Sequence, residues 1–223
     1  LSMKNLLVKI AATALISLGL VAQASAVDVK TYEDPYKMIE AVADQTFRRI
    51  SNDQPVIQKD IEHLRVIVNE ELVPYIDSRY AAFRVIGNYI KQTKPEERDA
   101  FVVAFKDYMV ATYAGALTQY KNQKVIFEPA RAVGTQNIVT IKTRVIDPGK
   151  PDINIEFKLR RAKDSQNWQV FDMVAEGISL LDSKRAELGN LIRQQGLASV
   201  TALLVEKSKA PITAPLQGND AKN

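Results

Sequence analysis

The 223-residue chain contains no cysteine and only one histidine, His63. Without cysteine it can form no disulfide and has no thiolate metal ligand or thiol nucleophile, so Cys–His catalysis is excluded. His63 falls on the polar side of a predicted amphipathic helix, where a solvated side chain is a better interpretation than a catalytic base. The stability of the protein must therefore come from its apolar core rather than from cross-links.

Several motifs of enzymes and nucleotide-binding proteins are lacking as well. Ser179 follows Gly177, but the sequence has no G-x-S-x-G elbow, no G-x-G-x-x-G and no phosphate-binding loop. The carboxylates of Glu70–Glu71 and Glu96–Asp99 lack the spacing of a calcium loop and are better interpreted as solvated helix ends. Lysine and arginine are scattered among acidic residues, which does not indicate nucleic-acid binding. We predict no enzyme activity, no metal, no cofactor and no nucleic-acid partner.

The first 26 residues have the organisation of a secretory signal peptide. Lys4 precedes an apolar stretch over Leu6–Val21, and Ala24-Ser25-Ala26 fits a cleavage site, so we predict cleavage after Ala26. An N-terminal membrane anchor is the weaker alternative, because the apolar run is short and ends on small residues. Removing this segment lowers the formal net charge from +4 to +2. We expect an exported protein of a bacterial periplasm.

Apolar residues at helical spacing predict four helices in the first half of the chain. Asp34 and Pro35 supply the N-cap and first position of one helix, and Thr93 with Glu96 resembles a capping box before another. The predicted helices cover residues 35–50, 57–72, 75–90 and 99–117. The last is apolar almost all round, which predicts burial on most sides or a cavity wall, and Lys106-Asp107 at its middle argues against a bilayer span.

After Asn122 the apolar period changes from 3.6 to 2. Strands are predicted over residues 125–128, 137–146, 153–160 and 168–174, and their short connections favour an antiparallel meander of about four strands. A helix over residues 183–195, ended by Gly196, and a short last helix follow. We therefore predict one α+β domain over residues 27–206, with a mobile tail over residues 207–223.

The stretch Asn167–Leu181 connects this sheet to the C-terminal helices. Its strand is predicted to alternate strictly, with Trp168, Val170, Asp172 and Val174 on one face. Both faces carry large apolar groups, which indicates a strand covered on two sides. The predicted helix over residues 99–117 and the predicted sheet together carry many apolar side chains. These side chains could form a solid core or could line a cavity between the helix and the sheet, and the pattern alone leaves both possibilities open.

Four segments together carry a resemblance to a known family. They are ELVPYID at Glu71–Asp77, the helix start at Thr93–Phe101 with Phe105–Tyr108, IKTRVIDP at Ile141–Pro148, and NWQV followed by DMVAEGISLL at Asn167–Leu181. The sequence resembles the MlaC family of periplasmic phospholipid-binding, or toluene-tolerance, proteins from Asp34 to about Lys207. The resemblance implies a monomeric carrier that moves phospholipid between an outer-membrane lipoprotein–porin complex and an inner-membrane MCE-domain ABC transporter, maintaining outer-membrane lipid asymmetry. It also implies that the acyl chains lie between a twisted sheet and helices, with the head group toward solvent.

The candidate lipid-lining residues combine the apolar pattern with this implied architecture. They are Tyr75, Phe83, Phe101, Phe105, Tyr108, Ile141, Val145, Ile155, Phe157, Val174 and Ile178. Candidates for weak phosphate or partner contacts, or merely solvated side chains, are Arg84, Arg131, Arg144, Arg160 and Arg161. Two other hypotheses stay open: a solute-binding or cavity-type enzyme domain, for which Asp172 with Tyr108 is the only polar pair, and an interaction protein or chaperone with a solid core.

Overall fold

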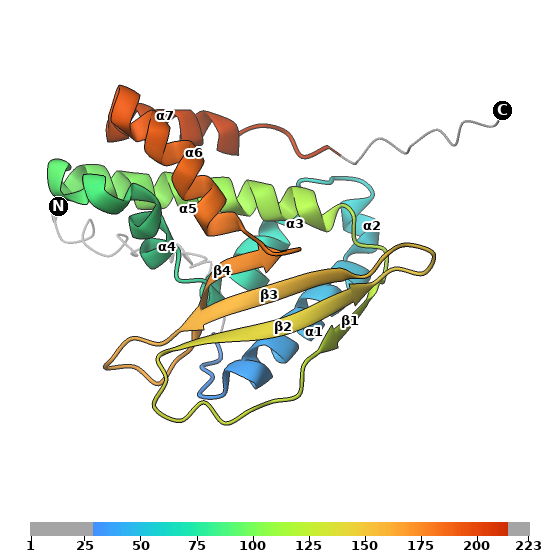
Figure 1. The fold of residues 1–223 in the computed structure, drawn as a ribbon. Helices are drawn as coiled ribbons and strands as arrows, with labels where there is room; N and C mark the ends of the chain where they lie inside the picture. Colours follow the sequence, from blue (N-terminus) through green and yellow to red (C-terminus); the bar gives the residue numbers. More distant parts are fainter. Residues whose placement is uncertain (1–28, 214–223) are drawn as a thin grey trace, which may run out of the picture.

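The computed structural model describes residues 29–213 as a five-stranded sheet with helices behind it and along one edge (Figure 1). The first helix, α1 (Pro35–Asn52), begins where the sequence predicts it. The Asp34 carboxylate accepts hydrogen bonds from the backbone N–H groups of Tyr36 at 2.9 Å and Lys37 at 3.2 Å. This capping, with proline at the first helical position, fixes the start of the helix that covers the sheet from behind.

The two helices predicted next are each interrupted. Residues 54–92 form α2 (Gln54–Ile57), α3 (His63–Ile67), the π-helix η1 (Val68–Leu72), the 3-10 helix η2 (Val73–Tyr75), α4 (Ser78–Ile86) and the 3-10 helix η3 (Gly87–Gln92). Pro74 accounts for the irregular turns, because its ring clashes with the carbonyl four residues earlier, inside η1. Gly87 ends α4 at φ +57°, a conformation that side chains with a Cβ rarely adopt.

The long helix α5 (Pro95–Leu117) starts one residue later than the predicted capping box would give. Its N-cap is Lys94, whose backbone N–H donates to the Glu97 carboxylate at 2.8 Å. The shift follows from Pro95, which favours the first helical position. Among the helices of residues 29–213, α5 is the one that is long and apolar enough to cross a membrane, by length and composition alone. Here it lies against α3, α4 and α7 (Leu197–Ser208), so it serves as a core helix of this fold.

The sheet is an antiparallel meander in the order β1-β2-β3-β4-β5. Its strands are β1 (Lys124–Phe127), β2 (Ile138–Ile146), β3 (Ile153–Arg160), β4 (Gln169–Ala175) and the two-residue β5 (Ile178–Ser179). The predicted α+β class and antiparallel connections are confirmed, with one short strand more than expected. From β5 the chain turns directly into α6 (Leu180–Gln195), which rises from the sheet toward α7 in Figure 1.

A β-bulge lies in β4. Lys158 pairs with Asp172, whereas the next residue, Leu159, pairs with Val170, which leaves Phe171 as the extra residue. A bulge places one unpaired residue in a strand and therefore reverses the faces of all residues beyond it. The strict alternation predicted for this strand is consequently wrong past the bulge.

Directly paired residues of antiparallel strands share a face, so the register assigns each side chain beyond the bulge. Met173, opposite Phe157, points to the same side as the buried residues of β2, whereas Val174, opposite Glu156, points to the other side. We call the face of the sheet that packs against α1 the inner face. Its residues are Val125, Phe127, Val139, Ile141, Thr143, Val145, Ile153, Ile155, Phe157, Leu159, Val170, Met173 and Ala175.

The buried apolar residues form three separate clusters rather than one. The helical cluster joins α4, α5, α6 and α7 and comprises Ala81, Ala82, Val85, Ile86, Phe101, Ala104, Phe105, Leu181, Leu188, Ile192, Leu197, Val200 and Leu204. The middle cluster comprises Ile50, Leu64, Ile67, Val68, Val110, Ala114 and Ile212. The sheet cluster lies between α1 and the inner face and comprises Met38, Ile39, Val139, Ile141, Leu159 and Trp168.

The end of the described chain is anchored. Arg65 donates to the carbonyl oxygens of Ser208 and Ala210, both at 2.7 Å, and the Ile212 N–H donates to the Glu62 carboxylate at 2.6 Å. The Ile212 side chain is buried in the middle cluster. The predicted mobile tail therefore needs correction over residues 207–213, while residues 214–223 and the predicted signal peptide up to residue 26 lie outside the described residues.

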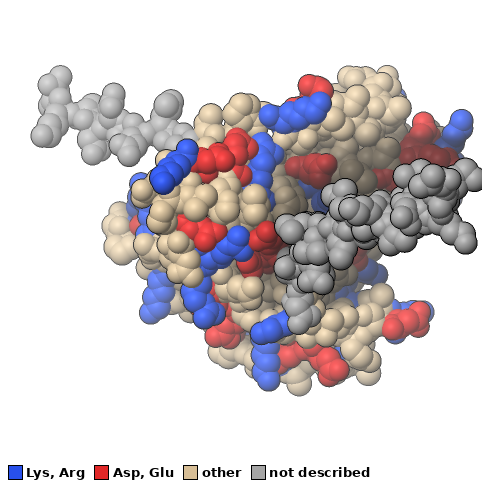
Figure 2. Space-filling view, turned by 180° about the vertical axis from the view of Figure 1, so that it is seen from behind, with Lys and Arg blue, Asp and Glu red and all other residues tan. Residues whose placement is uncertain are grey.

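Figure 2 shows the face opposite to that of Figure 1. On its described part, lysine and arginine side chains alternate with aspartate and glutamate. Such mixing produces no large field of one sign on this side of the molecule.

Candidate functional site

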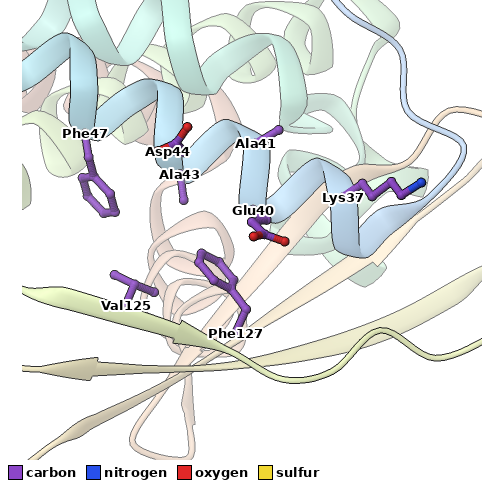
Figure 3. A pocket seen from close by; sticks show the side chains of 8 residues that line it. All are labelled: Lys37, Glu40, Ala41, Ala43, Asp44, Phe47, Val125 and Phe127. Carbon is purple, nitrogen blue, oxygen red and sulfur yellow. The ribbon is translucent and has the colours of Figure 1, made fainter.

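A groove of about 600 Å³ separates the helix α1 from strand β1 (Figure 3). Phe47 and Phe127 reach into it from opposite sides, and Val125 stands beside Phe127 on the strand. The full lining is Lys37, Glu40, Ala41, Ala43, Asp44, Phe47, Val125 and Phe127. Aromatic and aliphatic groups thus form the walls, while the charged groups all come from α1.

The strand side of this groove continues across the inner face. Val125 is paired with Val145 and through it with Ile153, whereas Phe127 is paired with Thr143, which leads to Ile155 and then to Ala175. Val145, Ile155 and Met173 are only half-buried although they face inward, and none belongs to the three clusters. This part of the inner face therefore has no tightly packed cover.

Half-buried apolar side chains also lie on the helices around the middle cluster. Phe47 of α1, Leu72 of η1, and Tyr113 and Leu117 of α5 border the middle cluster without being fully buried. A domain of this size usually has one contiguous core, whereas here the clusters are separated by half-buried apolar groups. Phe47 belongs both to the groove and to this border. We call the groove, this part of the inner face and the half-buried side chains beside the middle cluster the candidate cleft.

The structure distributes the eleven predicted lining residues over several environments. Val145 and Ile155 lie in the candidate cleft; Tyr75, Ile141 and Phe157 belong to the sheet cluster or its border. Four predicted aromatics lie instead in or against the helical cluster: Phe83, Phe101, Phe105 and Tyr108.

The reason for this division lies in α5. Phe101 and Phe105 are 0% and 2% exposed, and their rings stack with centroids 5.9 Å apart. This stripe of α5 faces α4, α6 and α7 rather than the sheet. Because α5 is apolar almost all round, the sequence did not show which stripe would face which neighbour.

Val174 and Ile178 lie away from the candidate cleft. Val174 faces the opposite side of the sheet because of the bulge, and Ile178 is 62% exposed. Both border a shallow polar hollow near the start of α6, together with Lys158 and Glu156.

The sequence reasoning missed several cleft residues. Phe47, Val125, Phe127, Tyr113 and Met173 were not selected, although all are apolar or aromatic. Phe47 stacks on Tyr120, which follows α5, at 4.4 Å, so the ends of α1 and α5 meet at the groove. A signal was visible for Phe47, which lies on the apolar face of the first predicted helix, and for Val125 and Phe127, which lie in a short predicted strand.

A charged network holds α1 to η1 beside the candidate cleft. Arg49 donates to Asp53 at 2.6 Å, to Glu70 at 2.8 Å and to Glu71 at 3.1 Å. His63 Nε2 lies 2.8 Å from the same Asp53 carboxylate, so the interpretation of His63 as a solvated residue needs correction. The hydrogen bonds from His63 and Arg49 lower the pKa of Asp53 below its ordinary value.

The polar pair considered for an enzyme does not form one site. Asp172 accepts hydrogen bonds from the Ser179 hydroxyl at 2.6 Å and from the Leu181 N–H at 3.0 Å, which caps the start of α6. Tyr108 lies under the Lys184 ammonium, 5.3 Å from its ring centroid. Within residues 29–213 no group of three histidine or carboxylate side chains could hold a metal ion.

The five candidate arginines all have protein partners. Arg160 binds Asp77 and lies over Tyr80, and Arg161 lies 5.0 Å from the Trp168 ring centroid. The remaining three are Arg84 over Tyr80, Arg131 with Glu128, and Arg144 with Asp152. They come from separate parts of the fold and do not converge on the candidate cleft.

A family model described as the MlaC protein matches residues 40–206. The chain belongs to the MlaC family. A relative from Haemophilus influenzae, the intermembrane phospholipid transport system binding protein MlaC, is 33% identical over 179 residues, which are 80% of this chain and 84% of that protein. The resemblance inferred from the four sequence segments is thereby confirmed.

The fold of this MlaC-family chain is similar to a solved structure. It is that of the phospholipid-binding protein from Ralstonia solanacearum in complex with a phospholipid, with a TM-score of 0.69 over 78% of this chain and 97% of that one. The two are 22% identical, so this likeness concerns the fold alone. The matched family region contains all five strands and most of α1, and hence both walls of the candidate cleft.

Proposed function

We propose that this chain is a periplasmic phospholipid carrier that holds the acyl chains of its ligand in the candidate cleft. The observation that carries the proposal is the division of the core into three clusters around half-buried, inward-facing apolar groups. Membership of the MlaC family supports a lipid as the occupant. The groove volume of about 600 Å³ lies within the roughly 300–1,000 Å³ typical of ligand sites.

The energetics of such a site suit a carrier. Burying about 30 methylene groups is worth on the order of 25 kcal/mol relative to water, at about 0.8 kcal/mol each. A bilayer offers the same groups nearly the same environment, so transfer between membrane and cleft is close to balanced. Docking to a partner then decides the direction of movement, and the carrier itself needs no nucleotide.

The head group belongs outside the cleft. Burying a phosphate without a paired cation is costly, and the five candidate arginines are engaged elsewhere in the fold. The charged side chains at the groove, Lys37, Glu40 and Asp44, come from α1 and border the opening. We therefore place the head group at this rim, in contact with water.

The pathway assignment rests on the family. We propose that the chain is exported with cleavage after Ala26 and exchanges phospholipid as a monomer between two complexes. One is an outer-membrane lipoprotein–porin complex and the other is an inner-membrane ABC transporter with an MCE domain. This role would maintain the lipid asymmetry of the outer membrane.

Native mass spectrometry of protein purified without detergent, followed by lipid extraction, tests the proposal. We expect a mass increase of one phospholipid for the wild type and its loss in Ile155→Glu, which places a charge in the cleft. Ile178→Glu is the matched control at an exposed position and should retain the lipid. Equal occupancy in both variants would show that the cleft is assigned to the wrong place, and an empty wild type that accepts no lipid from liposomes would refute the carrier function.

A further inference from the structure

Three charged side chains of α1 lie along the groove on successive turns: Lys37, Glu40 and Asp44. Asp44 already has a partner, because the guanidinium of Arg48, one turn further along the helix, binds its carboxylate. The side chains of Lys37 and Glu40 form no hydrogen bond or ion pair with any of residues 29–213. Within this range the groove therefore has one unpaired carboxylate and one unpaired ammonium at its rim.

The Glu40 carboxylate lies next to the apolar part of the groove. In Figure 3 the Glu40 side chain is directed from α1 toward β1, on the side where the Phe127 ring reaches up from the strand. The Lys37 side chain extends instead toward the start of α1. Glu40 and Lys37 are exposed, whereas Phe127 and Phe47 are half-buried. The charged groups thus have access to water at the mouth of the groove, while the rings form its walls.

A carboxylate and an aromatic ring at one opening are together suited to a cation. The face of an aromatic ring attracts an ammonium group within about 6 Å of its centre, and a carboxylate accepts charge-assisted hydrogen bonds from the same group. Residues three apart on a helix have Cβ atoms about 5–6 Å apart, so Lys37 and Glu40 can contact opposite charges that a short link separates. A phosphate and an amine joined by two carbon atoms, as in ethanolamine and choline head groups, have this arrangement. A head group that ends in glycerol offers no cation to Glu40.

We propose that the groove selects phospholipids with an amine-bearing, zwitterionic head group. Glu40 binds the ammonium beside the Phe127 ring, and Lys37, one turn away on α1, binds the phosphate. This inference rests on the proposed lipid-carrier function and adds to it the head-group class of the ligand. Glu40 is in this sense a specificity-determining residue, because all phospholipids have the phosphate but only some have the amine.

The test is a competition between phosphatidylethanolamine and phosphatidylglycerol with identical acyl chains. The full chain is loaded from liposomes that contain equal amounts of the two lipids, and the bound species are counted by native mass spectrometry. We expect the wild type to prefer phosphatidylethanolamine about 3- to 10-fold, the range of one exposed ion pair together with one cation–π contact. Glu40→Gln keeps the shape of the side chain without its charge and should bring the ratio close to one. Glu96→Gln, the same change at an exposed position in the first turn of α5, is the matched control and should keep the wild-type ratio.

A charge reversal and a change of salt concentration test the same contact in other ways. Glu40→Lys should shift the ratio in favour of phosphatidylglycerol, because two ammonium groups at the rim favour the anionic head group. In the wild type the preference should weaken when NaCl is raised from about 0.05 M to about 0.5 M, since salt screens an exposed ion pair. A wild-type ratio of one or below, a ratio that salt leaves unchanged, or an unchanged ratio in either folded Glu40 variant would overturn the head-group assignment while leaving the carrier function intact. If the wild type takes up neither lipid, it is the proposed function that fails.

Discussion

The separation of a solid helical core from an open apolar cleft predicts opposite responses to two truncations. Phe101→Ala removes a ring that is 0% exposed and stacked on Phe105 in the helical cluster. Ile155→Ala shortens a half-buried side chain in the candidate cleft, where the neighbouring space is already open. The first change should affect stability, and the second should affect lipid binding.

The magnitudes follow from burial. A fully enclosed phenylalanine truncated to alanine costs about 3–5 kcal/mol, because the transfer free energy is lost and a cavity remains. For Ile155 no new enclosed cavity forms and part of the side chain is already in contact with solvent. We therefore expect a loss of about 1 kcal/mol in the free energy of unfolding for Ile155→Ala, mainly the reduced apolar burial.

Urea unfolding of delipidated protein, followed by circular dichroism, measures both values, and native mass spectrometry measures lipid occupancy. Phe101→Ala should unfold at clearly lower urea but, where folded, carry as much lipid as the wild type. Ile155→Ala should lower the urea midpoint by only about a third or less of the shift caused by Phe101→Ala, and it should lose lipid. If Ile155→Ala were as destabilising as Phe101→Ala, the inner face would be part of a closed core and the cleft would not exist.

Three further predictions concern the polar contacts. Arg65→Leu removes the hydrogen bonds to the carbonyls of residues 208 and 210, so amide hydrogen exchange over residues 208–213 should rise while the sheet stays protected. The pKa of Asp53 is lowered in the folded protein. Its contribution to stability is therefore present above its ordinary pKa of 3.8 and is lost as pH falls through the lower folded-state value. Acid unfolding curves of Asp53→Asn should lack this part of the pH dependence. Asp172→Ala leaves the Leu181 N–H and the Ser179 hydroxyl without their acceptor and should lower the free energy of unfolding by about 1–3 kcal/mol in denaturant titrations.

The regular parts of the fold were accessible from the sequence because they depend on local signals. Asp34 with Pro35 sets the start of α1, and the change from helical to period-two spacing near Asn122 separates helices from the meander. The family could also be inferred from four short segments. These features involve neighbours within a few residues, where capping, turn chemistry and side-chain alternation act directly.

The cleft could be predicted only in part because it depends on pairing and on which helix faces are used. The bulge at Phe171 follows from the register with β3 and has no signal in β4 itself, yet it exchanges Val174 for Met173 on the inner face. Similarly, Pro74 predicts a disturbed helix but not a π-helical turn that brings Glu70 and Glu71 to Arg49. Each feature is decided by contacts between segments far apart in the chain.

A lipid carrier must remain folded when its cleft is empty, and the arrangement of the three clusters accounts for how this chain can do so. The helical cluster closes on itself with residues of α4 to α7 and takes no residue from β1, β2 or β3. The sheet is held separately, by the sheet cluster under α1 and by the Asp172 cap that joins β4 to α6. With the lipid in the proposed cleft, stability would come from packing that loading does not disturb, and the groups between the clusters would be left for the ligand. A fold of this kind can release its lipid without unfolding, which is what exchange between two membranes requires.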